Sequence, residues 1–467
     1  MAEGAPTVPD LPAVLEPLTD ESLKQSMANK FDICGFKKES TLFDSTIDSY
    51  NAWFKDYILH LLTQKKKWQV LMKQHGLATY VTVAPTRFPP KLEKIKKLIR
   101  RGIPPEWRGN AWFFYAGGHE KLNKNVGVYD QIVKDTVGMQ NKDTEVIERD
   151  LHRTFPDNKY FKPELVDGIV RPGEAPMITS LRRVLVAFAQ SRPQIGYCQS
   201  LNFLVGLLLL FMSEERSYWM LVIITERIIP QVHLANLEGV HTDQGVLMMC
   251  IHEYIPKLWS LIGKSFDGTV LKDDKILTRP PPLTLVTSAW FMSMFVGILP
   301  IESVLRFWDI IFYEGSKTLF RLSLTICRLS MDHPNFCGNR DSRNADEKET
   351  DQIEIFQFIQ NFPKTITDPS LLINLCFKKI GGYGFGFLSQ DEINRCREFV
   401  AQQRSRLRTK SIAGVDLSDS ERAALRGSSS DNAIHDVYGF QKLIMSGVAW
   451  NMHISSVMKR KLSKRTD

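Results

Sequence analysis

Apolar residues recur at three- and four-residue spacings along most of the chain, the pattern of helices that bury one face. The pattern runs from about 40 to 75 and over Lys91–Arg101, and it resumes at Ile178 in a helix that Pro193 should end. Further helices are expected over Leu207–Met212, Tyr218–Ile229, Val246–Ile262, Leu283–Ile298, Ile301–Tyr313 and Leu319–Leu329. Apolar–polar alternation bounded by hairpin turns is missing, so we predict an all-α fold.

Shifts in composition divide the chain into four parts. Residues 1–30 are Pro-rich and acidic and are expected to be disordered, and 31–94 should form a helical N-terminal extension. Residues 95–385 are dense in aromatic and aliphatic side chains and should form one large multi-helix domain. Residues 386–467 should form a C-terminal helix and a flexible basic tail. The hydrophilic segment Asn339–Asp351 is expected to be a surface loop.

The most apolar run, Phe203–Met212, has ten residues, about half of the roughly 20 that a membrane-spanning helix needs. We therefore predict a helix buried on all sides and no transmembrane segment. The first residues, MAEGAPTVPDLP, lack the charged and apolar regions of a secretory signal. Seven scattered cysteines, with no CxxC pair and no metal-ligand spacing, indicate reduced thiols in a cytoplasmic protein.

The formal net charge of +8 lies largely at the C-terminus, where residues 404–467 contain 12 Lys/Arg and 6 Asp/Glu. The middle of the chain is nearly balanced and no zinc-finger, RRM or basic-helix signature occurs, so no nucleic-acid partner is expected. The tail ends in a basic cluster of Lys459, Arg460, Lys461, Lys464 and Arg465, here called the tail cluster. Three interpretations of it stay open: peripheral contact with the anionic lipid of an endomembrane, a nuclear signal, and a solvated end.

Two short stretches combine turns with polar side chains. In RRGIPPEWRGNAW (100–112) a Gly-Ile-Pro-Pro turn precedes a helix on which Arg108 and Trp112 share one face, and we expect both to be structural. In SRPQIGYCQSLNF (191–203) one helix ends, a turn follows, and Gln199 stands where the next, buried helix begins. Taken alone, each stretch is also compatible with ordinary packing.

The stretch VIERDLHRTFPDN (146–158) places an acid and a base three residues apart. On a helix, Ile147 faces the core, and the Asp150 carboxylate can hold the Arg153 guanidinium in one orientation. Pro156 disfavours helix at the residue before it, so Arg153 should project from a helix end. Taken alone, such a pair is usually a solvated surface ion pair.

Taken in order, these three stretches resemble the TBC domain of Rab GTPase-activating proteins. That family has a Gly-Ile-Pro turn followed by Arg and Trp, an Ile-x-x-Asp-x-x-Arg motif and a Tyr-x-Gln motif. The matching residues are Gly102-Ile103-Pro104, Arg108, Trp112, Ile147, Asp150, Arg153, Tyr197 and Gln199. Later blocks also match at Trp290-Phe291, Leu299-Pro300, Arg306, Trp308-Asp309, Glu314-Gly315 and Phe320-Arg321. The resemblance covers roughly residues 95–385 and departs at Ser200, where most members have Gly.

The resemblance implies an all-helical domain that binds a GTP-bound Rab-type small G protein and stimulates its GTP hydrolysis, as in vesicle trafficking. Arg153 would be an arginine finger and Gln199 a glutamine finger, both supplied in trans. Asp150 would orient Arg153, and Tyr197 would pack beside Gln199 or contact the G protein. The chain has no GxxxxGK[ST] loop, so GTP and Mg²⁺ would belong to the substrate and no cofactor of its own is expected.

Two alternatives remain. The chain could be a non-catalytic TBC scaffold that holds a G protein without accelerating hydrolysis, although the presence of both Arg153 and Gln199 argues against this. It could instead be a membrane-surface adaptor that acts through the tail cluster. A GTPase assay separates the first alternative from the catalytic one, and vesicle sedimentation tests the second.

Overall fold

The computed structural model describes residues 27–42, 46–80, 83–163, 165–166, 169–170, 173–264, 281–337, 352–378, 383–385 and 388–412. These residues form helices and one short antiparallel hairpin, β1 (Leu165–Val166) with β2 (Ile169–Val170), so the all-α prediction is confirmed. The tail cluster and Asn339–Asp351 lie outside the described residues, as do residues 1–26. Residues 27–30, which were expected to be disordered, make hydrogen bonds; the Met27 carbonyl accepts from Lys38 and Asn51.

The chain divides into two compact units, Met1–Ile228 with Leu305–Gly315, and Ile229–Val304 with Ser316–Asp467. The α-helices of the first unit are α2 (Lys38–Thr41), α3 (Ile47–Gln74), α4 (Glu93–Arg101), α5 (Arg108–Tyr115), α6 (Gly118–Asn123), α7 (Val128–Asp135), α8 (Lys142–Leu151), α9 (Pro176–Ser191), α10 (Leu201–Leu209), α11 (Glu214–Ile223) and the C-terminal part of α15 (Ile301–Glu314). Shorter helical turns span Pro105–Trp107, Lys159–Phe161 and, as a π-helix, Ile224–Ile228.

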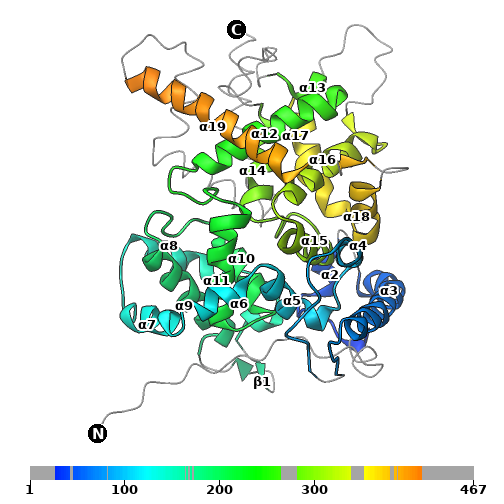
Figure 1. Cartoon of the computed structure of the whole chain (residues 1–467), viewed down its shortest axis with the longest axis vertical. Coiled ribbons are helices and arrows are strands. Elements are labelled where there is room, and N and C mark those ends of the chain that lie inside the picture. Colours follow the sequence, from blue (N-terminus) through cyan, green and yellow to red (C-terminus); the bar gives the residue numbers. More distant parts are fainter. Residues whose placement is uncertain are drawn as a thin grey trace. The chain divides into compact units, whose positions relative to one another are not determined.

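The core of the first unit forms around α9 and α10 (Figure 1). Helix α9 packs against α7, α8, α10 and α11, and every residue of α10 is buried, as the apolar run Phe203–Met212 predicted. Pro176 begins α9, where its missing N–H costs nothing, and the helix ends at Ser191, two residues before Pro193. The long helix α3 begins at a capping box in which Thr46 and Ser49 exchange hydrogen bonds.

The second unit contains α12 (Glu238–Tyr254), α13 (Pro256–Ile262), α14 (Leu283–Met292), the start of α15, α16 (Lys317–Asp332), α17 (Gln352–Asn361), a helical turn over Phe362–Thr365, α18 (Pro369–Phe377) and α19 (Gln390–Ile412). Helix α12 packs against α13, α14, α16 and α19. Two ion pairs hold α19 on α12: the Arg397 guanidinium donates to both Asp243 oxygens at 2.6 and 2.9 Å, and Arg404 contacts Glu238 at 2.7 Å.

Four predicted helices have clearly different bounds in the structure. The predicted Leu207–Met212 helix is α10, which begins earlier, at Leu201, and ends at Leu209. The Val246–Ile262 prediction was wrong in joining two helices, because Ile255 and Pro256 break the segment between α12 and α13. The Leu283–Ile298 helix ends early at Met292, and the Tyr218–Ile229 helix begins at Glu214 and changes at Ile224 into the π-helical turn.

Candidate functional site

Arg153 stands just beyond the end of a helix that is fixed at both ends. A capping box between Asn141 and Thr144 begins α8, and Ile147 and Leu151, both fully buried, anchor it on the core. The helix ends at Leu151, so Arg153 follows two residues later, and its side chain is 36% exposed. The backbone is therefore rigid while the guanidinium remains accessible.

The Asp150 carboxylate joins Arg153 to Tyr197. Asp150 is 1% exposed; its Oδ1 accepts a hydrogen bond from Arg153 Nη2, and its Oδ2 accepts one of 2.7 Å from Tyr197 Oη. Burial raises the pKa of Asp150, while the hydrogen bond from Tyr197 and the Arg153 charge act in the opposite direction. Arg153 and Tyr197 thus both bind the Asp150 carboxylate, although Tyr197 is 47 positions from Asp150 in the sequence.

Gln199 follows Tyr197 closely along the chain, but its side chain is not exposed. It is two residues after Tyr197, so their Cα atoms are at most about 7 Å apart. Its side chain is buried, with the residue only 3% exposed, and Oε1 has no hydrogen-bond partner among the described residues. The loop that carries Tyr197 thus also holds a buried carboxamide oxygen without a hydrogen-bond partner among the described residues.

The turn after α8 is tied directly to the start of α10. The Thr154 hydroxyl donates to the Asp150 carbonyl at 2.8 Å and accepts from Asn202 Nδ2 at 2.9 Å. A Cβ at Gly206 would approach Thr154 Cγ2 to 2.9 Å and the Phe155 ring to 3.0 Å, so only glycine permits this contact. The sequence motifs did not reveal Thr154 and Asn202, because the signal is a contact between segments 48 residues apart.

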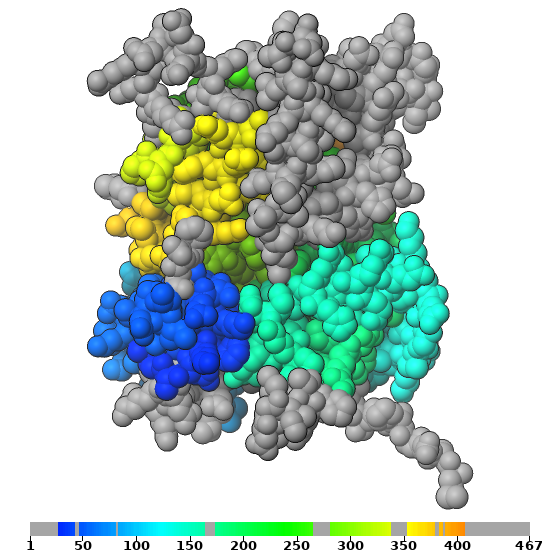
Figure 2. All heavy atoms as spheres, turned by 180° about the vertical axis from the view of Figure 1, so that it is seen from behind, coloured from blue at the N-terminus to red at the C-terminus, as the bar shows by residue number. Residues whose placement is uncertain are grey.

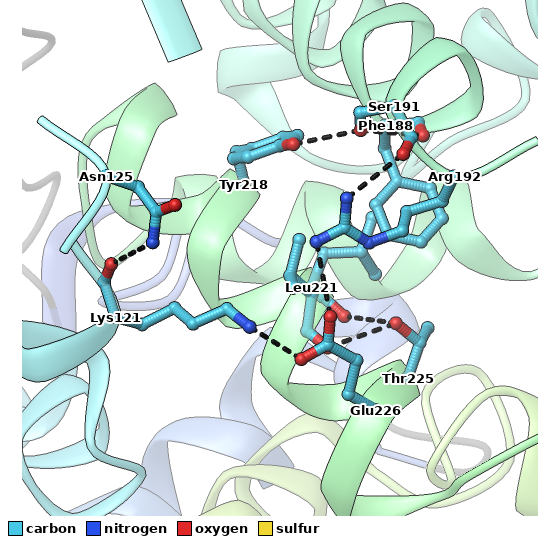
Figure 3. A network of polar contacts seen from close by, with 10 residues as sticks. Lys121, Asn125, Phe188, Ser191, Arg192, Tyr218, Leu221, Thr225 and Glu226 are labelled. Atoms are coloured by element: carbon cyan, nitrogen blue, oxygen red, sulfur yellow. Dashed lines mark hydrogen bonds and ion pairs between the residues drawn. The ribbon is translucent and has the colours of Figure 1, made fainter. Parts of the chain in front are cut away.

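A surface network holds the beginning of the loop that carries Tyr197 and Gln199 (Figure 3). Arg192, the C-cap of α9, donates to Glu226 on the π-helical turn at 3.2 Å, and Lys121 on α6 donates to the other Glu226 oxygen at 2.6 Å. The Arg192 carbonyl accepts from Gly196 N–H at 2.9 Å, which closes the turn. A π-helical turn often marks a functional element, and here it anchors the base of the loop.

Arg108 and Trp112 lie in a different, fully buried cluster around Asp309. Trp112 Nε1 donates to Asp309 Oδ1 at 2.8 Å, Ile103 N–H donates to Oδ2 at 3.0 Å, and Arg108 Nε lies 3.4 Å from Oδ2. Both Arg108 and Trp112 are 0% exposed, so neither side chain is accessible to a partner. This cluster joins the end of α4 and α5 to the part of α15 in the same unit.

Within the described residues, no group of three His, Cys, Asp or Glu side chains is arranged to hold a metal ion. All seven cysteines are free, and six of them are buried. Burial raises the pKa of the Cys198 thiol, beside Gln199, to about 12, so it is not a nucleophile at neutral pH. Over the same residues, no helix has both the length and the apolar character to cross a bilayer.

Comparison with known proteins decides the family. The model of the Rab-GTPase-TBC domain matches residues 105–334, which include Arg153 and Gln199. The GTPase-activating protein GYP3 of Saccharomyces cerevisiae is 42% identical over 93% of this chain and 75% of its own length. The chain belongs to the Rab-GTPase-TBC domain family. A second yeast relative, the GTPase-activating protein MSB4, is 41% identical over 84% of this chain and 85% of its own length.

A solved TBC domain shares the fold. The Chlamydomonas flagellar RabGAP TBC domain aligns with 74% of this chain and 99% of its own length at a TM-score of 0.54 and 22% identity. Within the TBC family, the structure also explains the position after the motif glutamine. Ser200 has φ 99° and ψ −27°, a conformation that favours glycine, the residue most members carry there.

Proposed function

We propose that this chain stimulates GTP hydrolysis by a GTP-bound Rab-type small G protein, with Arg153 as the principal catalytic residue. Membership of the family supports this, as do two relatives named GTPase-activating proteins that align with most of the chain. The observation that carries the proposal is an accessible guanidinium on a rigid element, oriented by the buried Asp150. GTP and Mg²⁺ belong to the substrate.

The chemistry of phosphoryl transfer needs this kind of group. Negative charge redistributes over the bridging and γ-phosphate oxygens in the transition state, and positioned cations stabilise it. A planar guanidinium offers several fixed donors and stays charged, whereas a lysine ammonium is a single flexible point charge. Asp150 restricts Arg153 to one orientation before the G protein binds, which reduces the entropy lost on reaching the transition state.

Gln199 is proposed to position the attacking water. A carboxamide can accept a hydrogen from water while donating to the phosphoryl group, without acting as a strong base. Its burial means that the side chain must rotate toward the G protein when the complex forms. The absence of a partner for Oε1 among the described residues lowers the cost of that rotation, because no hydrogen bond of this oxygen has to break.

A non-catalytic TBC scaffold is the second candidate, and the burial of Gln199 is the observation that favours it. In either case the chain is proposed to be cytoplasmic and to contact membranes only peripherally. The tail cluster of Lys459, Arg460, Lys461, Lys464 and Arg465 is one proposed place of contact.

Single-turnover GTP hydrolysis across a panel of purified Rab proteins tests both candidates. We expect acceleration on at least one of them and a loss of about 10³-fold or more in Arg153→Ala, with an unchanged melting temperature. Gln199→Ala should also slow the reaction. Arg149→Ala is the matched control, because Arg149 is an exposed arginine on α8, the helix that ends two residues before Arg153. Tight binding of a Rab without acceleration would instead identify a scaffold, and a fully active Arg153→Ala would refute the finger.

A further inference from the structure

A strongly basic surface lies on α3 and α4. Residues 64–101 contain 11 Lys/Arg and one Asp/Glu, Glu93, so the near balance of charge in the middle of the chain hides a local excess. Six of these basic residues are exposed and form no ion pair with any residue in the described ranges. They are Lys66, Lys67, Lys73, Lys94, Lys97 and Arg101, here called the α3–α4 basic face.

The two helices present these cations on one continuous surface. Lys94 Nζ donates to Gln74 Oε1 at 2.9 Å, and His60 Nε2 lies 2.8 Å from the Arg101 carbonyl, so both ends of α4 contact α3. Along α3 the exposed positions recur every three or four residues, from Leu59 through Lys66 to Lys73, opposite the buried face. With 28 residues, α3 is about 42 Å long, so the surface is extended and not a pocket.

Apolar side chains are interspersed among the cations. Leu59 and Val70 on the outer face of α3 are 64% and 58% exposed, and Leu92, just before α4, is 50% exposed. Lysines and arginines with exposed aliphatic residues between them are typical of helices that lie on a lipid surface. We propose that the α3–α4 basic face binds the anionic surface of a phospholipid bilayer.

A bilayer fits this surface better than an acidic protein segment does, because the cations are spread along an extended face with aliphatic side chains between them. The face also leaves the Asp150 cluster free. In Figures 1 and 2 the segment up to about residue 100, in blue, and the helices α7 to α9, in cyan to green, lie on opposite sides of the first unit. Membrane contact and G-protein contact are therefore compatible.

Sedimentation of the full-length chain with phosphatidylcholine vesicles, with and without phosphatidylserine, tests the proposal. Each cation near an anionic surface increases partitioning about fivefold. We expect binding only to the anionic vesicles, and a loss of about 100-fold in the triple variant Lys66→Gln, Lys67→Gln and Lys73→Gln. The α4 triple, Lys94→Gln, Lys97→Gln and Arg101→Gln, should lose a similar amount.

Two full-length controls separate the sources of binding. Lys124→Gln, Lys134→Gln and Lys142→Gln remove the same charge from exposed lysines elsewhere in the first unit and should leave partitioning within about threefold. Glutamine at the five positions of the tail cluster should leave most of the binding in place. The proposal is overturned if the wild type does not sediment with the anionic vesicles, if the tail variant alone loses binding, or if all variants lose it equally. Unchanged helical content and melting temperature show that the variants are folded.

Discussion

Asp150 is the residue on which the candidate site depends, because it is buried and yet holds an exposed partner. Its two oxygens are divided between Arg153 and Tyr197, so the carboxylate relates the end of α8 to the loop before α10. If the carboxylate served only to stabilise the fold, two buried hydrogen-bond donors would stabilise it as well as the present pair does. Here one donor is a 36% exposed guanidinium, and an exposed ion pair adds little stability.

The variant Asp150→Asn tests whether Asp150 orients the Arg153 guanidinium or mainly stabilises the fold. Burial raises the pKa of Asp150, so its contribution to stability is largest below the unfolded pKa and is lost as pH rises through the folded pKa. A neutral amide removes this cost at pH 7, and we expect the free energy of unfolding to fall by no more than about 1 kcal/mol. The maximal stimulated rate should fall about tenfold or more, because Arg153 loses its orienting charge.

The measurement is single-turnover hydrolysis at increasing chain concentration, together with urea unfolding. The chain concentration that gives half the maximal rate should change little, because the Asp150 side chain is buried and we expect no direct contact between it and the G protein. Tyr197→Phe is the matched control: it removes one hydrogen bond to Asp150, keeps the pair with Arg153, and should lose less of the rate. A large drop in stability that accounts for the lost activity would contradict the positioning role.

At the scale of elements, a residue with a strained backbone stands at the start of α10, directly beside the proposed catalytic Gln199. Ser200 is fully buried with φ 99°, where an L-residue is strained by roughly 1–2 kcal/mol, and it directly follows Gln199. The neighbouring contacts of Asn202 with Thr154 and of Gly206 with Phe155 hold this backbone in place. Strained residues persist where the surrounding packing fixes them, often at functional sites.

The stability of variants at Ser200 should depend on how well the new residue accepts a positive φ, and not on its polarity. Ser200→Gly relieves strain but loses the hydroxyl, so we expect the free energy of unfolding to stay within about 1 kcal/mol of wild type. Ser200→Val puts a β-branched side chain at positive φ in a packed core and should cost more than about 2 kcal/mol. Ser200→Ala, which keeps the strain and lacks the hydroxyl, should fall between them in urea unfolding. Equal losses in the free energy of unfolding for Ser200→Gly and Ser200→Val would show that the Ser200 hydroxyl, and not the backbone conformation, determines stability at this position.

The sequence predicted the elements of the site better than the contacts between them. Proline and polar breakers located the ends of α8 and α9, because those signals are local. The Tyr197–Asp150 hydrogen bond and the Asp309 cluster join segments 47 to about 200 residues apart and have no local signal. Met294 and Phe295, in the turn that follows α14, have φ 47° and 65°, although neither residue favours that conformation, because both side chains are fully buried there.

At the scale of the whole molecule, the basic character is concentrated in two segments. Residues 64–101 carry a net +10 and residues 404–467 a net +6, whereas the entire chain carries +8, so the rest of the chain has a net charge of −8. The sequence pI of about 9.0 therefore reflects the segment that holds the α3–α4 basic face together with the C-terminal tail. Such a charge distribution favours directed contact with an anionic surface over general attraction to polyanions.

Salt should therefore separate the two activities proposed for this chain. Raising ionic strength from 0.1 to 1 M shortens the screening length from about 10 to about 3 Å, so we expect partitioning onto anionic vesicles to fall at least tenfold. The single-turnover rate at saturating chain should change less than about twofold, because Arg153 would act at contact distance, where screening is weak. The α3 triple variant, already depleted of charge, should show a shallower salt dependence than wild type in the same vesicle assay. Binding that survives 1 M salt would mean that Leu59, Val70 and Leu92 dominate the contact, and the electrostatic account of this surface would then be wrong.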